Sequence, residues 1–348
     1  MRSARLTAAA AAALTVVVPL SGCLAGEAED AADASAGPSD GDELVVDWAT
    51  YNPLSMVIRD QGWLEEALAD DGVDVTWVQS AGSNRANELL RSGEADVAST
   101  AGSAALLARA NGSPIRTIDI YSQPEWSALV TDPGSGIEEV TDLAGRSVAA
   151  TKGTDPYFFL LQALLEAGVD PADVEIQNLQ HADGNTALQN GSVDAWAGLD
   201  PIMADAEQDG SELFYRNVDF NTYGFLNARE DFLEDSPEVA QVVVDTYEYA
   251  RTWAAEHPEE TAEILAEDAG IDLSLAQQVI TERSNLDVDG APGPAQLEVL
   301  TTIGPMLVET GDVASQEQID EALADLLDDS WVRQADPEAV ADVVGQAP

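Results

Sequence analysis

The feature that most constrains the fold is an alternation of short apolar runs with helical stretches between residues 44 and 225. Strands are predicted at residues 44–46, 73–78, 95–98, 115–120, 128–130, 147–150, 174–179 and 195–198. Helices are predicted between them at residues 54–68, 85–92, 104–110, 157–167 and 185–189. Because strands that alternate with helices are typical of parallel βαβ units, the chain is predicted to have an α/β fold.

After Phe225 the pattern becomes almost entirely helical. Ser236 followed by Pro237 is typical of a helix start, and a second helix is expected to begin at Pro258. Further helices are predicted at residues 294–309 and 315–327. Their polar faces are acidic and would be repelled by anionic lipid, so we interpret these helices as scaffold rather than as a membrane surface.

Small polar residues gather where the predicted strands give way to helices, at residues 51–55, 80–84, 99–103 and 151–156. Each loop would place hydroxyl groups and free N–H groups at the carboxyl edge of a sheet, where open α/β sheets bind ligands and where anions are favoured. Ser, Thr and Asn are also ordinary helix caps, so any one loop fits a structural role. Four such loops in register favour a binding cleft.

One lysine and several aromatic side chains lie near the same strand ends. Lys152, the only lysine, stands at a predicted helix start, where a cation is unfavourable unless an anion lies beside it; an incidental surface position is the alternative. Trp48, Trp126, Trp196 and Tyr223 could line a small-molecule cleft or belong to the core.

The charge balance excludes one class of partner. The chain has 65 acidic and 14 basic residues, a formal net charge of −51. Nucleic-acid-binding proteins need basic surfaces against phosphate, so no nucleic acid is expected as a partner. Scattered acidic residues instead indicate a solvated surface suited to high ionic strength.

The N-terminus resembles a lipoprotein export signal. Arg2 and Arg5 precede an apolar run of about 15 residues, shorter than the roughly 20 that span a bilayer. The run ends in LSGC at residues 20–23, which resembles a bacterial lipobox; an ordinary signal peptide with an incidental cysteine is the alternative. We expect residues 1–22 to be a signal peptide, Cys23 to carry a lipid, and residues 23–43 to form a disordered acidic tether. The rest would work outside the cell, anchored to the outer face of the membrane.

Catalytic and metal-binding equipment is sparse. Cys23 is the only cysteine, so the exported domain has no disulfide and no thiolate site. His181 and His257 are the only histidines, and nucleophile-elbow, phosphate-loop and dinucleotide motifs are absent. No metal and no cofactor are therefore expected, and an enzyme using His181 is the alternative to a binding protein.

Three segments carry a family resemblance: residues 93–100 (GEADVAST), 148–154 (VAATKGT) and 187–197 (ALQNGSVDAWA), the last followed by Asp200 and Pro201. They resemble the substrate-binding proteins of aliphatic sulfonate ABC importers, from about residue 44 to the C-terminal helices. The same superfamily includes binders of taurine, nitrate and thiamine pyrimidine precursors, and these ligands are the alternatives.

The resemblance implies a type II periplasmic-binding-protein fold, in which two α/β domains joined by a two-strand hinge enclose a ligand cleft. Domain 1 would comprise residues 44–130 and 225–348, and domain 2 residues 131–224. The hinge would lie at residues 128–130 and 224–226.

The resemblance also implies the function of a monomeric, non-enzymatic receptor that binds a small anionic sulfonate and delivers it to ABC permease subunits. The implied ligand-binding residues are Asn52, Ser80, Gly82, Ser83, Ser99, Thr100, Trp126, Lys152, Gly153, Thr154, Trp196, Asp200 and Tyr223. The chain departs from some relatives by carrying Leu199 before, and Ile202 after, the Asp-Pro pair.

Overall fold

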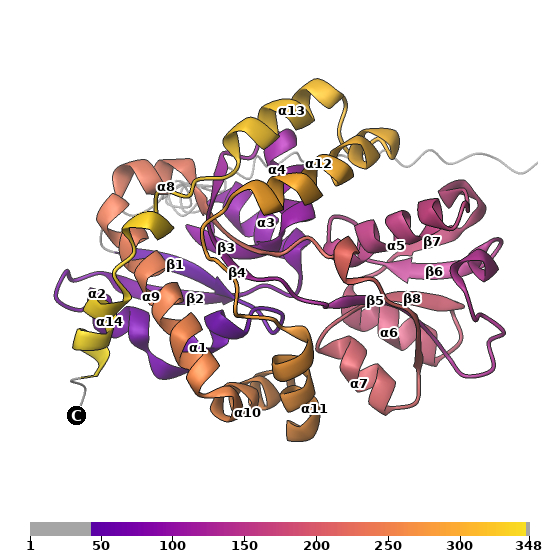
Figure 1. Ribbon diagram of the computed structural model, residues 1–348, viewed down its shortest axis with the longest axis horizontal. Helices are drawn as coiled ribbons and strands as arrows, with labels where there is room; N and C mark the ends of the chain where they lie inside the picture. The colour runs from indigo at the N-terminus through magenta and orange to yellow at the C-terminus, as the bar shows by residue number, and fades with distance from the viewer. Residues whose placement is uncertain (1–42, 346–348) are drawn as a thin grey trace, which may run out of the picture. The chain divides into compact units, whose positions relative to one another are not determined.

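The computed structural model describes residues 43–345 (Figure 1). The predicted signal peptide, the lipidated Cys23 and most of the predicted tether lie outside the described residues. Within the described residues, no helix combines the length and apolar character needed to cross a membrane.

Five strands form the first sheet, in the order β2-β1-β3-β10-β4. Strand β1 pairs in parallel with β2 and β3, whereas β10 is antiparallel to β3 and β4. The strand bounds are β1 Glu43–Trp48, β2 Asp74–Gln79, β3 Val97–Ala101, β4 Ile115–Ser122 and β10 Gly224–Arg229.

A second sheet has the matching order β7-β6-β8-β5-β9. Strand β6 is parallel to β7 and β8, and β5 is antiparallel to β8 and β9. The bounds are β5 Ser127–Thr131, β6 Ser147–Ala150, β7 Glu175–Asn178, β8 Ala195–Leu199 and β9 Glu212–Tyr215. These two mixed sheets confirm the predicted α/β fold class.

The chain changes sheet twice, between β4 and β5 and between β9 and β10. Residues 123–126 and 216–223 make these two crossings. The segments expected as a hinge, 128–130 and 224–226, lie inside strands β5 and β10. The domain boundaries given above stay a prediction.

Helices follow the parallel strands and cover the sheets. The helices up to β10 are α1 Pro53–Gln61, α2 Trp63–Leu68, α3 Ser83–Ser92, α4 Gly102–Ala110, α5 Asp155–Glu166, α6 His181–Gln189 and α7 Ile202–Gln208. Short 3₁₀ segments occupy Val140–Leu143, Pro171–Asp173 and Val218–Phe220. The single helix predicted at residues 54–68 is wrong, because Gly62 adopts a left-handed conformation (φ 69°) that ends α1 before α2 begins.

The C-terminal region is helical, as predicted. Its helices are α8 Glu230–Asp235, α9 Pro237–Glu256, α10 Pro258–Ala269, α11 Leu273–Gln278, a π-helix Val279–Arg283, α12 Pro294–Glu309, α13 Gln316–Asp325, a 3₁₀ turn Val332–Gln334 and α14 Pro337–Val344. Helix α9 packs on α1 and α2, and α12 packs on α4 and α13. Both faces of the first sheet are covered. Adjacent residues of a strand point to opposite faces, and in β3 Val97 packs in the apolar cluster beneath α1 and α9, whereas Ala98 packs in the apolar cluster beneath α4.

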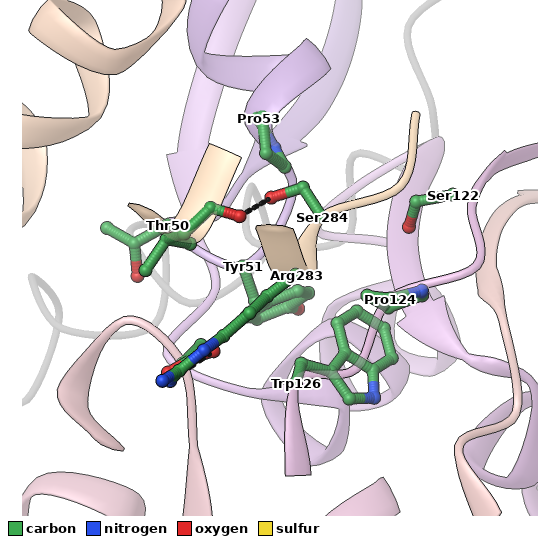
Figure 2. A pocket seen from close by; sticks show the side chains of 10 residues that line it. Thr50, Tyr51, Pro53, Ser122, Pro124, Trp126, Arg283 and Ser284 are labelled. Carbon is green, nitrogen blue, oxygen red and sulfur yellow. Dashed lines mark hydrogen bonds and ion pairs between the residues drawn. The ribbon is translucent and has the colours of Figure 1, made fainter. Parts of the chain in front are cut away.

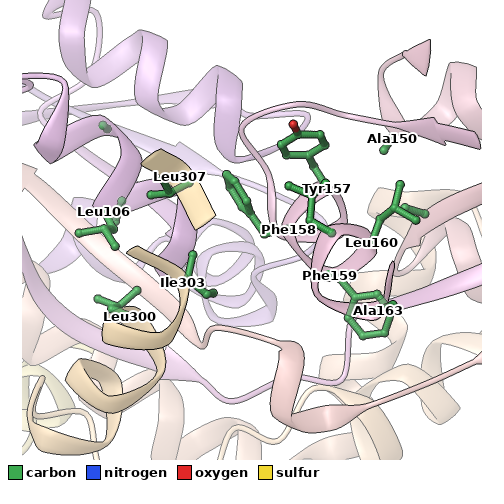
Figure 3. Packing of buried hydrophobic residues seen from close by; sticks show 14 of the residues in the cluster. Leu106, Ala150, Tyr157, Phe158, Phe159, Leu160, Ala163, Leu300, Ile303 and Leu307 are labelled. Carbon is green, nitrogen blue, oxygen red and sulfur yellow. The ribbon is translucent and has the colours of Figure 1, made fainter. Parts of the chain in front are cut away.

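One apolar cluster contains residues from the layers of both sheets (Figure 3). Phe158 of α5 is fully buried in it together with Leu106 of α4 and Ile303 and Leu307 of α12. Helix α5 itself packs on strands β5, β6 and β8 of the second sheet. Phe158 therefore joins a helix of the second sheet to two helices that cover the first.

Replacing this side chain tests how much the shared cluster stabilises the protein. Phe158→Ala should lower the free energy of unfolding by about 3–5 kcal/mol, because it removes buried apolar contacts and leaves a cavity. Leu165→Ala on the same helix is the control, since Leu165 is 44% exposed and should cost no more than about 0.5 kcal/mol. Urea unfolding of the three proteins measures both values, and equal losses would contradict the assignment.

Candidate functional site

The carboxyl ends of the parallel strands carry the polar loops of both sheets. Helices α1, α3 and α4 begin after β1, β2 and β3, and α5, α6 and α7 begin after β6, β7 and β8. Ser103 at the start of α4 donates from Oγ to Asp155 Oδ1 at 2.7 Å, at the start of α5. These two starts, one from each sheet, are therefore in direct contact.

Most of these helices start without a side-chain cap. Asn52 caps α1, its Oδ1 accepting a hydrogen bond from the Ser55 N–H at 3.3 Å. Helices α3, α5 and α6 have no side-chain cap on their first-turn N–H groups. The polar loops before them thus do not serve as caps, and the N–H groups keep the partial positive charge that attracts anions.

The predicted site residues Ser80, Gly82 and Ser83 follow β2, whereas Ser99 and Thr100 lie inside β3 rather than in a loop after it. All five are buried, and several of their hydroxyls have partners within the first sheet. Ser83 Oγ accepts from the Ala101 N–H at 2.9 Å, and Thr100 Oγ1 accepts from Asn227 Nδ2 at 2.8 Å. Ser80 Oγ is shielded from solvent and interacts with the Asp47 carboxylate.

Ser99, another predicted site residue, donates to a buried carboxylate that the sequence analysis missed. Its N–H and Oγ donate to Asp47 Oδ1 at 2.8 and 3.1 Å. Burial raises the pKa of Asp47 from 3.8 to about 7, and hydrogen bonds from the Ser80 side chain and from the Ser99 N–H and side chain oppose the increase. Tyr51 OH donates to the Ser99 carbonyl at 2.9 Å, and Asn52 Nδ2 donates to Tyr247 OH at 3.3 Å. A polar network therefore lies beneath the edge of the first sheet.

The predicted residues after β6 approach the first sheet. A Cβ built on Gly153 would lie 3.7 Å from Leu107 Cδ2 and 3.9 Å from Asn84 Cβ. Thr154 Oγ1 donates to the Thr151 carbonyl at 2.6 Å rather than capping α5. Lys152 is exposed, and its Nζ lies 5.7 Å from the centre of the Tyr157 ring.

The predicted aromatic residues occupy different surroundings. Trp196 is completely buried on the opposite face of β8 from the cluster of Phe158, packed with Met203 and Leu188. Tyr223 lies in the second crossing with a positive φ of 64°, and its carbonyl accepts from the Gly102 N–H at 3.2 Å. The Trp126 side chain instead donates from Nε1 to Asp155 Oδ2 at 2.8 Å, at the start of α5.

The Asp155 carboxylate accepts hydrogen bonds from four donors, and the sequence analysis did not identify this residue either. Besides Ser103, its carboxylate accepts from Trp126 Nε1 at 2.8 Å, Thr222 Oγ1 at 2.6 Å and the Thr222 N–H at 2.9 Å. Burial raises the pKa of Asp155, and hydrogen bonds from Thr222, Trp126 and Ser103 oppose this. One carboxylate thus links the starts of α4 and α5 with both crossings.

An ion pair forms a second link between the two halves, beside a small space that Arg283, Tyr51 and Trp126 border (Figure 2). Arg283 Nη1 lies 3.2 Å from Asp200 Oδ1, and Nη2 donates to Glu207 Oε2 at 2.6 Å. The Arg283 and Asp200 side chains are 2% and 4% exposed. Burial raises the pKa of Asp200 to about 6, while Arg283 opposes the shift. The free space beside them, bordered by Tyr51 and Trp126, is only about 10 Å³, room for one water molecule at most.

His181 begins α6 and is 1% exposed. Its Nδ1 lies 3.3 Å from Thr151 Oγ1, and its Nε2 has no hydrogen-bond partner among the described residues. Burial lowers the pKa of His181 to about 4, so the ring is neutral at physiological pH. Among residues 43–345, no group of three or more His, Cys, Asp or Glu side chains could hold a metal ion.

Comparison with known proteins identifies the family that the chain matches. A family model described as NMT1/THI5 like matches residues 56–261, more than half of the chain. The chain is 27% identical over 242 residues to the "Putative aliphatic sulfonates-binding protein" of Bacillus subtilis (strain 168), covering 68% of this chain and 73% of that protein. It is 28% identical over 181 residues to the taurine-binding periplasmic protein of Escherichia coli (strain K12), covering 49% of this chain and 55% of the relative.

A solved structure has the same fold. The alkanesulfonate-binding protein SsuA from Xanthomonas axonopodis pv. citri, bound to MOPS, superposes with a TM-score of 0.74 and 20% sequence identity. The match covers 82% of this chain and 99% of that one. The predicted type II binding-protein fold is thereby confirmed.

The raised pKa of Asp47 predicts a pH dependence of stability. Between about pH 4 and 7 the folded protein holds a proton on Asp47 that the unfolded chain releases, so this residue's contribution to the free energy of unfolding falls as pH rises. Asp47→Asn removes the titration. The difference in unfolding free energy, variant minus wild type, should therefore increase from about pH 5 to 8 in urea titrations.

Asp142→Asn is the matched control for this measurement. Backbone hydrogen bonds lower the pKa of Asp142, so its contribution changes only below about pH 4. Its difference from wild type should stay constant over the same range. A constant difference for Asp47→Asn as well would contradict the raised pKa.

Arg283→Met should destabilise the protein by about 3 kcal/mol, because Asp200 would keep its burial and lose its cationic partner. Arg85→Met, at an exposed pair with Glu88, is the control and should have no measurable effect. Urea unfolding measures both, and the double variant Arg283→Met/Asp200→Asn should recover part of the loss. Equal losses of unfolding free energy in Arg283→Met and Arg85→Met would contradict the assignment of a buried ion pair.

Proposed function

The chain belongs to the NMT1/THI5-like family, and from this membership we propose that it binds an aliphatic sulfonate outside the cytoplasm and delivers it to an ABC importer. It is a solute-binding protein of the sulfonate, taurine and nitrate transporter group. The observation that carries the choice of an anionic ligand is the set of helix starts α3, α5 and α6, which meet at the facing sheet edges without side-chain caps.

Neutral donors suit this ligand. A sulfonate stays ionised at physiological pH, and the first-turn N–H groups of a helix stabilise a negative charge without a basic side chain. Lys152 lies exposed at the rim and would attract the anion rather than enclose it.

Closure of the two halves would couple binding to transport. The bonds of Asp155 with Ser103 and of Arg283 with Asp200 are contacts of a closed state. A ligand that contacts loops of both sheets adds to these contacts and shifts the population towards closure. The importer would then distinguish the closed, loaded protein from the open one.

The remaining parts of the proposal concern location and ligand identity. Cys23 would carry a lipid that holds the protein at the outer face of the cell membrane. Domain 1 (44–130 and 225–348) and domain 2 (131–224) would move about the crossings, and the ligand residues predicted from the sequence would line the cleft. Taurine, nitrate or a thiamine pyrimidine precursor is the alternative ligand, and an enzyme using His181 is the alternative function.

Ligand titration tests the proposal. Isothermal titration of the purified protein with alkanesulfonates, taurine, nitrate and a pyrimidine should show binding of at least one sulfonate. That ligand, at one hundred times its dissociation constant, should raise the free energy of unfolding by about 2.7 kcal/mol. Analysis of the ligand after incubation should find it unchanged. The absence of both heat and thermal shift with every sulfonate would refute the substrate, and release of a product would favour the enzyme.

A matched pair of variants tests the role of the α3 N-terminus. Ser83→Pro removes one N–H at the first helical position, where proline is tolerated and where the extended Gly82 (ψ 161°) accepts a following proline. Ser83→Ala removes only the hydroxyl. We expect Ser83→Pro to weaken sulfonate binding about tenfold relative to Ser83→Ala, and equal affinities would exclude this N–H as a ligand contact.

A further inference from the structure

Two buried acceptor atoms lie close to Gly82, one from each half of the site. Asn84 Oδ1 belongs to the first turn of α3, and His181 Nε2 to the first residue of α6. Both atoms are shielded from solvent, and neither has a hydrogen-bond partner in the part of the chain that the structure describes. Buried polar atoms are normally paired, so this pair of atoms calls for a partner.

The hydrogen bonds around Thr151 determine which nitrogen of His181 carries the proton. Thr151 Oγ1 has one hydrogen, which it donates to the Leu179 carbonyl at 2.7 Å. Towards His181 Nδ1, at 3.3 Å, the Thr151 hydroxyl can therefore only accept. Nδ1 carries the proton, and because the buried ring is neutral, Nε2 presents a lone pair.

Both acceptors border the same small region. A Cβ built on Gly82 would lie 2.9 Å from Asn84 Oδ1 and 3.0 Å from His181 Nε2. The neighbouring starts of α3 and α6 also present first-turn N–H groups without side-chain caps. The region thus offers donors for an anion and, beside them, two acceptors that an anion cannot satisfy.

We propose that His181 Nε2 and Asn84 Oδ1 select a sulfonate that carries an N–H or O–H donor on its carbon chain. The inference rests on the function proposed above and narrows its substrate class. A plain alkanesulfonate would fill the cleft and leave both acceptors unpaired, and sites built around a polar group of the substrate discriminate strongly against analogues that lack it. A hydroxyl or an ammonium group satisfies the same acceptors.

Three ligands of equal chain length test the proposal: ethanesulfonate, 2-hydroxyethanesulfonate and 2-aminoethanesulfonate. Calorimetric titration of the purified full chain should show the hydroxyl or amino compound binding at least about tenfold more tightly than ethanesulfonate. His181→Leu should reduce this ratio to about one, chiefly by weakening the binding of the hydroxyl and amino compounds. A purely structural role of His181 would instead weaken all three ligands alike.

Two further variants keep the test decisive. His181→Gln places an amide oxygen near the position of Nε2 and should restore part of the preference. Asn84→Ala, at a half-buried residue, should reduce the ratio even where the His181 variants fold poorly. Equal wild-type affinity for the three ligands, or an unchanged preference in His181→Leu and Asn84→Ala, overturns the inference and leaves sulfonate binding intact. Failure of all three ligands to bind, together with every longer alkanesulfonate, overturns the proposed function and this inference with it.

Discussion

The buried carboxylate of Asp155 is the interaction on which the arrangement of the two halves depends. It is fully enclosed, and such a charge is strongly unfavourable unless donors replace the lost water. The donors come from three separate places: Ser103 at the start of α4, Trp126 in the first crossing and Thr222 in the second. All of them must be in position together, so the start of α5 holds both crossings against the edge of the first sheet.

This arrangement determines which polar groups remain for a ligand. The indole N–H of Trp126 is occupied by Asp155, and the hydroxyls of Ser99 and Ser83 already have partners within the first sheet. Among the described residues, the facing loops leave the starts of α3, α5 and α6 without side-chain caps, and they leave Asn84 Oδ1 and His181 Nε2 without a hydrogen-bond partner. The helix starts would favour the charge of an anion, and the two acceptors would favour a ligand that also carries a donor.

The alternation of strands and helices predicted eight of the ten strands that the described residues form, because each βαβ unit is encoded by local periodicity, but β9 and β10 were missed. Three of the polar segments were located at strand ends, whereas residues 99–101 of the fourth belong to β3 itself. Local pattern also could not show which side chains within these segments are free. Trp196 illustrates the limit: its place beside a strand end is visible in the sequence, whereas its burial beneath α6 depends on which face of β8 it occupies. The partners Asp200 and Arg283 are 83 residues apart, and no spacing rule joins them.

Under the proposed function, the strongly negative chain would bind an anion without spare positive charge in its interior. Among the arginines that form ion pairs, three have the least exposed side chains, and each of them neutralises a buried carboxylate of the fold: Arg229, Arg251 and Arg283. Removing one of them to hold a ligand would leave that carboxylate uncompensated, so the arginines serve the scaffold. Backbone dipoles at helix starts do not have to neutralise a buried carboxylate, and their effect is strongest within the first turn of a helix. Recognition through helix termini therefore lets an acidic protein keep its surface charge and still enclose a negatively charged ligand.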